Sequence, residues 1–170
     1  MNVVLARWNA APLEAAASLI LPCCGSKAWA SEMAARRPFP DEVALMGASD
    51  EVWHNLSESD WMDAFNSHPR IGESKALNSS AQRSSAWATQ EQKKVADTGD
   101  AVKIALAEAN REYENKFGRI FIVCATGKSA TELLETLRHR LQNDATNELH
   151  EAAEQQRQIT QIRLRKWLQE

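Results

Sequence analysis

Apolar residues recur every three or four positions along most of this chain, a spacing typical of amphipathic helices. The pattern is clearest before Phe117, where Val102, Leu106, Ala109 and Tyr113 fall on one face of a long helix. Proline, glycine and small polar residues mark the breaks between such segments and favour helix ends there. The predicted helices cover about residues 3–9, 12–21, 26–35, 41–56, 57–67, 80–89, 100–117, 129–142 and 144–169.

Two segments depart from this periodicity. Residues 68–79 contain Pro69, Gly72 and several small polar residues, so they are predicted to form a loop. Residues 120–124 are consecutive apolar residues rich in β-branched side chains, which favours an extended conformation. The sequence therefore predicts an all-α fold: a single-domain helical bundle over residues 1–170 with one short extended segment near 119–125.

Composition and charge exclude several classes of function. The chain has 170 residues, of which 44% are hydrophobic and 25% charged, as expected for one globular domain. A net charge of -3 with scattered Lys and Arg residues argues against nucleic-acid binding. The longest apolar stretch, residues 13–24, is too short to cross a membrane. No signal peptide is expected, and three cysteines make a poor disulfide framework, so a cytoplasmic location is predicted.

The titratable residues offer few alternatives for chemistry. None of the four histidines stands at a recognised ligand spacing from Cys, Asp or Glu, so no metal site is predicted. The six glycines are dispersed and form no nucleotide-binding loop. A nucleophilic pair of Cys24 with His68 remains open, although nothing in the local sequence supports it.

The strongest local candidate is His68, which follows an amphipathic helix and precedes Pro69. Histidine titrates near neutrality and serves as a general acid or base, and loops on rigid scaffolds often carry such groups. Gly72 is expected to let the backbone pass close to another group. The plainer interpretation is a histidine that caps its own helix with its ring in solvent. Gln82 and Arg163, taken alone, are interpreted as surface and helix-face residues.

The order of several motifs resembles one family, the 2-oxo-4-hydroxy-4-carboxy-5-ureidoimidazoline (OHCU) decarboxylases of urate degradation. The resemblance extends over some 140 residues. The matching segments are Cys23-Cys24-Gly25 with Trp29 and Met33, Arg37-Pro38-Phe39, Trp61 to Phe65, Ser67-His68-Pro69-Arg70-Ile71-Gly72, Phe117 to Cys124, Asn143-Asp144 and Ile162-Arg163-Leu164.

This resemblance implies a cofactor-free carboxy-lyase that is all-helical and usually a homodimer, with a small anionic imidazoline as substrate. His68 matches the catalytic histidine and Arg163 an arginine that binds the substrate. Gln82 stands where the family commonly has a glutamate, so an amide would replace a carboxylate beside the histidine. The segments that match the pocket lining are Pro69, Ser79, Ser80, Ala81, Gln82 and Arg83, and Phe121, Ile122, Val123, Cys124 and Ala125.

The implied reaction is decarboxylation of OHCU to (S)-allantoin, with His68 moving a proton, Gln82 orienting the substrate and Arg163 binding it as a planar fork. Backbone amides of residues 122–125 are expected to supply fixed dipoles. Two alternatives remain open. One is a non-catalytic helical interaction module, suggested by the six tryptophans. The other is a related ureide-processing enzyme with a different substrate, for which the Gln82 change leaves room.

Overall fold

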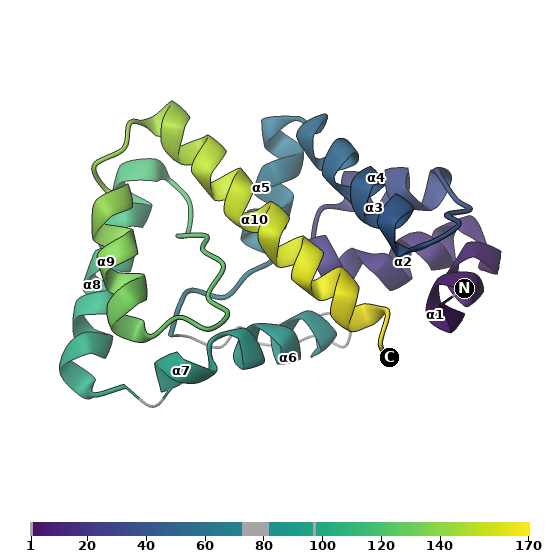
Figure 1. The fold of residues 1–170 in the computed structure, drawn as a ribbon. Coiled ribbons are helices and arrows are strands. Elements are labelled where there is room, and N and C mark those ends of the chain that lie inside the picture. The colour runs from purple at the N-terminus through teal and green to yellow at the C-terminus, as the bar shows by residue number, and fades with distance from the viewer. Residues whose placement is uncertain (1, 73–81, 97) are drawn as a thin grey trace. The chain divides into compact units, whose positions relative to one another are not determined.

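The computed structural model describes residues 2–72, 82–96 and 98–170, and helices dominate it (Figure 1). No strand is present in these residues, so the predicted all-α fold is confirmed. The helices are α1 (Val3–Ala10), α2 (Leu13–Cys24), α3 (Lys27–Ala35), α4 (Glu42–His54), α5 (Glu58–Asn66), α6 (Gln82–Glu91), α7 (Lys93–Ala96), α8 (Asp100–Phe117), α9 (Ala130–Arg140) and α10 (Ala145–Trp167).

Most helix ends lie where the sequence places them, because local capping chemistry sets them. Asp41 accepts from the Ala44 amide at 2.8 Å at the start of α4, as predicted. Gly118 ends α8 with a φ of +70°, which glycine adopts without strain. Two details differ from the prediction. Helix α2 continues through Pro22 to Cys24, and the short helix α7 was not predicted.

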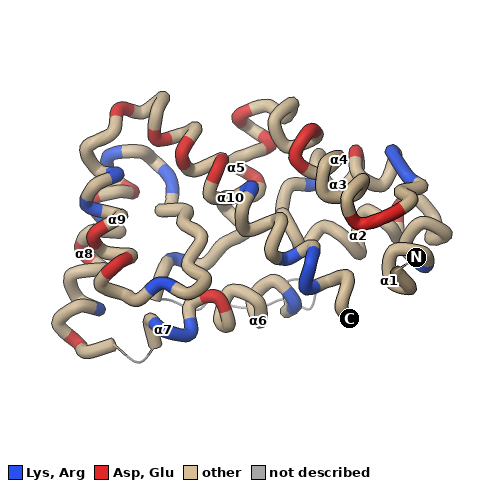
Figure 2. Tube along the Cα trace, viewed as in Figure 1, with Lys and Arg blue, Asp and Glu red and all other residues tan. Residues whose placement is uncertain are grey.

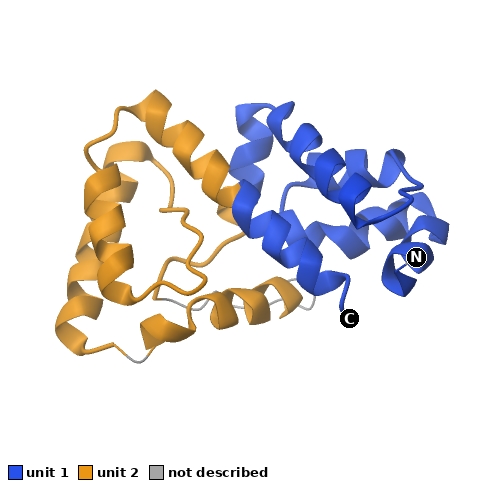
Figure 3. Cartoon of the chain, viewed as in Figure 1, with its two compact units in different colours: residues 1–64, 157–170 blue, residues 65–156 orange. Residues whose placement is uncertain are grey.

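The chain divides into two compact units (Figure 3). Unit 1 comprises residues 1–64 and 157–170, and unit 2 comprises residues 65–156. Within unit 1, helices α1 to α4 pack in sequence order around a core rich in aromatic residues. Trp8 stacks on Phe39 with the ring centroids 6.0 Å apart, and its indole donates to the Ala16 carbonyl at 2.8 Å. Aromatic packing with a satisfied indole N–H thus fixes this core.

The tryptophans do not form an exposed surface. All six are at most 9% exposed: Trp8, Trp29, Trp53, Trp61, Trp87 and Trp167. They pack in the core. Their burial also removes the observation that suggested an interaction module, because exposed aromatic anchors are what such a surface would need.

Arg37, in one of the motifs shared with the decarboxylase family, has a structural role in unit 1. Its guanidinium donates to the carbonyl oxygens of Ala11 at 2.8 Å and Trp8, and its Nε donates to Ala34 at 2.8 Å. These carbonyls lie in or just after the last turns of α1 and α3, where most backbone acceptors lack partners within the helix. The arginine therefore ties the two helix ends together.

Unit 2 is built on the pair α8 and α9, which pack against each other. The face of α8 that was predicted from the periodicity is the one that enters this core. The segment at residues 121–125 is buried in the same core but forms no ladder with another segment. The core consists of Ile71, Val95, Leu106, Ala109, Tyr113, Phe121, Val123, Ala125, Ala130, Leu133, Leu134 and Leu137.

Charged residues of both signs are scattered over the helices of each unit (Figure 2). This distribution provides no basic stripe of the kind that binds nucleic acid in the residues drawn. No helix among the described residues is both long enough and apolar enough to span a bilayer. His54, His139 and His150 are exposed.

Candidate active site

The part of the His68 loop that the structure describes, residues 67–72, is held on both sides of His68 within unit 2. On its N-terminal side, the His68 amide donates to the Phe65 carbonyl at 3.2 Å, and Phe65 is fully buried. Pro69 follows at once and cannot continue a hydrogen-bonded turn, so the chain leaves the helix here. The main chain of His68 is thus fixed by the last turn before the loop.

The C-terminal side of the loop is held by helices α6 to α8. Arg70 forms a forked ion pair with Glu114 of α8, with its Nε 3.0 Å from both carboxylate oxygens. The Gly72 amide donates to Gln92 at 2.9 Å, and the Ile71 carbonyl accepts from Asn110 at 3.3 Å. A loop with this many partners holds its residues in defined positions.

Gly72 is needed for a different reason from the predicted one. Its φ is +87°, a left-handed conformation that other residues adopt only with strain. A Cβ placed on this residue would meet nothing within 4 Å. The expectation of a close backbone approach is therefore wrong, and the tight turn is what requires glycine.

The His68 side chain is half-buried and hydrogen-bonded, not a cap with its ring in solvent. Its Nε2 lies 2.6 Å from Oε1 of Gln156 on α10, and Gln156 is completely buried. The sequence interpretation missed Gln156. The available signal was its place between Ala153 and Ile159, three residues from each on the apolar face of α10. A glutamine on such a face must find a partner, because an unsatisfied buried amide is costly.

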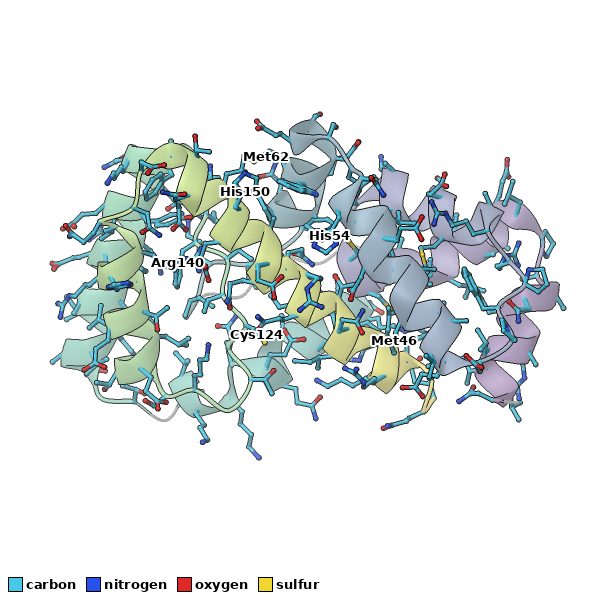
Figure 4. The ribbon with its side chains drawn as sticks, turned by 45° about the horizontal axis from the view of Figure 1, so that its top comes forward. Met46, His54, Met62, Cys124, Arg140 and His150 are labelled. Atoms are coloured by element: carbon cyan, nitrogen blue, oxygen red, sulfur yellow. The ribbon has the colours of Figure 1, made fainter. Side chains whose placement is uncertain are left out.

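The segment at residues 121–125 is buried, and part of its polar backbone is already engaged. The Cys124 amide donates to Oε1 of Gln155 at 2.9 Å, and the Ile122 carbonyl accepts from Arg140. Figure 4 labels Cys124 and Arg140, which reaches this segment from the end of α9. The expectation that amides 122–125 act as dipoles toward a ligand therefore does not hold for Cys124, whose N–H is engaged by a side chain.

A buried ionic network supports this segment. Arg140 pairs with Glu148. The Glu148 carboxylate also accepts hydrogen bonds from the Tyr113 hydroxyl at 2.5 Å and from the side-chain amide of Asn143 at 3.0 Å. Burial, and then the hydrogen bond to the Glu148 carboxylate, raise the pKa of Tyr113 well above its usual value. The tyrosine stays protonated and serves as a donor. This arrangement is structural and leaves no group poised for proton transfer.

The other predicted site residues fall into three groups. Gln82 and Arg83 are exposed at the start of α6. Arg163, in unit 1, is 2% exposed and donates to the Pro22 carbonyl at 3.4 Å, so it is buried and does not merely cover the core with its stem. The third group, Ser79, Ser80 and Ala81, lies outside the described residues.

Cys24 is poorly suited to act as a nucleophile. Its side chain is fully buried, and this burial raises its pKa to about 12, against smaller opposing effects that include Thr160 and Arg163. A thiol of this kind is protonated at neutral pH, whereas the nucleophile is the thiolate. The structure thus weighs against the Cys24–His68 pair that the sequence left open.

A cavity of about 370 Å³ lies in unit 2 beside the His68 loop. Pro69, Ile71 and Gly72 line it from the loop, and α6 to α8 supply the other walls. His68 itself is not among the lining residues. For metals, residues 2–72, 82–96 and 98–170 contain no group of three or more His, Cys, Asp or Glu side chains that could bind an ion.

Fold and site together define an all-α protein with a loop histidine that is hydrogen-bonded to a buried glutamine. The sequence model of the OHCU decarboxylase family matches residues 9–165, so this chain belongs to that family.

Two curated relatives illustrate the match. The chain is 36% identical over 146 residues to the uric acid degradation bifunctional protein TTL of Arabidopsis thaliana, covering 85% of this chain and 44% of that protein. It is 28% identical over 134 residues to the 2-oxo-4-hydroxy-4-carboxy-5-ureidoimidazoline decarboxylase of Amia calva, covering 78% and 75%. The chain therefore spans less than half the length of the Arabidopsis protein.

Solved structures agree with the assignment to this family. A crystal structure of OHCU decarboxylase in the presence of (S)-allantoin shares 31% identity and a TM-score of 0.77, covering 90% of this chain and 99% of that one. A crystal structure of (S)-allantoin synthase matches with a TM-score of 0.71 at 17% identity, over 96% of this chain and 53% of that one. The second match supports the fold alone.

Proposed function

We propose that this protein decarboxylates OHCU to (S)-allantoin, with His68 as the general acid or base. The observation that carries the proposal is the match of the family over residues 9–165, which includes the whole His68 loop. Within that loop the imidazole is fixed by a buried hydrogen-bond partner, as a proton-transfer group requires.

The chemistry of the substrate suits a protein that uses only its own side chains. C4 of OHCU carries both a hydroxyl and a carboxylate. Loss of carbon dioxide leaves an electron pair at C4, which the neighbouring C5–N unsaturation can take up. The protein must then bind the anion, orient the carboxylate and deliver a proton to one face of C4, and this last step sets the S configuration.

The roles of the residues follow from their chemistry. His68 moves a proton at the hydroxyl or at the developing carbanion. Arg163 binds the ring carbonyl or ureido group with its planar guanidinium. Gln82 orients the substrate by hydrogen bonds, together with the lining segments 79–83 and 121–125 and Pro69. We also propose that the two units work as one domain, since the family match extends over residues of both.

Assembly and location are part of the same proposal. We propose a homodimer, as the family resemblance implies, and a cytoplasmic location, because Cys23, Cys24 and Cys124 are all present as thiols. Analytical ultracentrifugation of the purified protein tests the first point, and fractionation of source cells tests the second.

The deciding experiment follows the circular dichroism of allantoin after mixing the protein with freshly generated OHCU. Rapid formation of one enantiomer is expected. His68→Ala should lower kcat by at least about 10²-fold, the lower bound for general acid–base catalysis, while the helical spectrum is retained. His139→Ala, which changes an exposed histidine on α9, serves as the control. An active His68→Ala enzyme, or only slow racemic decay with the wild type, would overturn the proposal.

Substitution of Gln82 helps to distinguish OHCU decarboxylation from the reaction of a related ureide-processing enzyme. Gln82→Glu introduces the glutamate that the family commonly has at this position, and a slower variant would show that the site is built around the amide. A faster variant would show that the site uses an acid at this position. Loss of OHCU turnover together with processing of another ureide would favour the related enzyme.

A further inference from the structure

Gln156 is a buried polar partner of the His68 ring, and it lies outside every motif that suggested function. Its Oε1 is 2.6 Å from His68 Nε2, and none of its surface is exposed. We propose that Gln156 is a positioning residue that fixes the tautomer and the orientation of the His68 imidazole. This inference rests on the proposed function, because it gives His68 a defined state for proton transfer.

The tautomer follows from the chemistry of the amide. An amide oxygen only accepts hydrogen bonds, so the atom facing Oε1 must carry a hydrogen. His68 Nε2 is therefore the protonated nitrogen of the neutral ring, and the basic lone pair is on Nδ1. A 2.6 Å contact allows little rotation of the ring about its own axis. Gln156 thus selects the nitrogen that takes up a proton.

Gln156 itself has a fixed position. It lies on α10 beside Gln155, whose Oε1 accepts from the Cys124 amide at 2.9 Å and whose Nε2 donates to Glu151 at 3.1 Å. Two consecutive glutamines of one helix thus contact the two segments that match the pocket of the family, the His68 loop and residues 121–125. An apolar residue would fill position 156 at lower desolvation cost, so the buried amide is explained by the hydrogen bond that it makes.

Charge distinguishes this arrangement from the usual carboxylate–histidine pair. A carboxylate facing Nε2 would favour the charged imidazolium by direct attraction. A neutral amide orients the ring without adding that attraction. Gln156 therefore contributes geometry and no charge to its contact with His68.

The test uses the full chain with ¹⁵N-labelled histidine. The wild-type protein should show His68 as the Nε2–H tautomer in its ¹⁵N spectrum, and His68→Ala assigns the signal. Gln156→Met keeps the side-chain volume and removes the acceptor. This variant should show a mixture of both tautomers and a kcat lower by on the order of 10–100-fold, the range for loss of a partner that orients a functional histidine. KM should change little, because a positioning residue acts through His68 and not through substrate binding.

Gln158→Met is the matched control. It makes the same substitution on α10, two residues further on and about 200° around the helix from Gln156. It should retain the wild-type tautomer and kcat. Gln156→Asn keeps an amide but shortens the side chain, so its oxygen would not reach the ring. This variant should therefore restore neither the Nε2–H tautomer nor most of kcat.

Three outcomes overturn the inference. They are an Nδ1–H tautomer in the wild-type protein, an unchanged tautomer in folded Gln156→Met, and an unchanged kcat in that variant. The wild-type spectrum decides the matter even if Gln156→Met does not fold. If the wild-type protein makes no allantoin, the proposed function fails, while the spectrum still tests the contact between Gln156 and His68.

Discussion

Arg140 and Glu148 form an ion pair whose side chains are 4% and 0% exposed. Arg140 Nε lies 2.9 Å from Glu148 Oε1, and the same guanidinium donates to the Ile122 carbonyl. Glu148 also accepts from Tyr113 of α8, so the pair connects three helices of unit 2 to the segment at residues 121–125. A buried pair is tolerated when hydrogen bonds satisfy both partners, as they do here.

Removal of one partner from this pair should be costly. Glu148→Ala would leave the Arg140 guanidinium buried without its counter-ion, and we expect a loss of about 3–5 kcal/mol in the free energy of unfolding. Urea denaturation followed by circular dichroism measures it. Glu135→Ala, an exposed glutamate on α9, should change the stability far less. A loss below about 1 kcal/mol for Glu148→Ala would mean that water reaches the pair.

Gln155→Leu should release the segment at residues 121–125. The substitution removes the acceptor of the Cys124 amide and leaves a buried donor unsatisfied, at a cost of about 1–3 kcal/mol. Hydrogen exchange followed by mass spectrometry should show faster exchange in peptides that contain Cys124. The exposed Gln142→Leu provides the comparison. Unchanged exchange in Gln155→Leu would show that other contacts suffice to hold the segment.

The Cys24 thiol should resist alkylation in the folded protein. Burial raises its pKa to about 12, so the reactive thiolate is scarce at pH 8. Burial likewise raises the pKa of Cys124. Iodoacetamide at pH 8 should therefore modify neither residue until denaturant is added, as peptide mass spectrometry would record. Rapid modification of Cys24 in the native protein, with loss of activity, would restore the cysteine nucleophile as a candidate.

The capping box of α9 should make stability sensitive to acid. Ser129 and Glu132 cap each other, and the Ser129 amide, donating to the Glu132 carboxylate at 2.7 Å, lowers the pKa of Glu132 below its ordinary 4.5. A lowered folded-state pKa stabilises the protein above the unfolded-state value, and this contribution disappears as pH falls through the folded-state value.

Glu132→Gln isolates that charge, because glutamine also fits a capping box. The Tm of the wild-type protein should exceed that of Glu132→Gln at pH 7, and the gap should close as pH falls from 4.5 through the lowered folded-state pKa of Glu132. Ser129→Ala should abolish the pH dependence of this gap and itself cost about 1 kcal/mol. A gap that persists at low pH would contradict a charge effect.

Local chemistry explains why so much of the fold could be predicted. Caps such as Asp41 and stops such as Gly118 act through residues adjacent in sequence, and the periodicity of α8 identifies its buried face without knowledge of the partner. Helix α7 was missed because four residues are too few for a periodic signal. Helix α8 begins at Asp100, where the sequence places it, and Gly99 is its N-cap.

The sequence could predict a site residue only where the residue type and its neighbours in the chain both indicated a functional role. His68 stands beside a proline in a loop, and the family resemblance strengthens it. Gln156 could not be found in this way, because a glutamine on a long helix has the same local pattern whether its amide faces solvent or a histidine. Its partner is 88 residues distant in sequence.

The sequence by itself determined the helices, their caps and the family of this protein, since these depend on interactions between near neighbours and on the order of motifs. Only the tertiary structure decided which polar groups are buried together. The Gln156–His68 contact, the Gln155–Cys124 contact and the Arg140–Glu148 pair arise when α9, α10 and the loops pack. Burial removes water as a partner and obliges each polar group to find another within the fold.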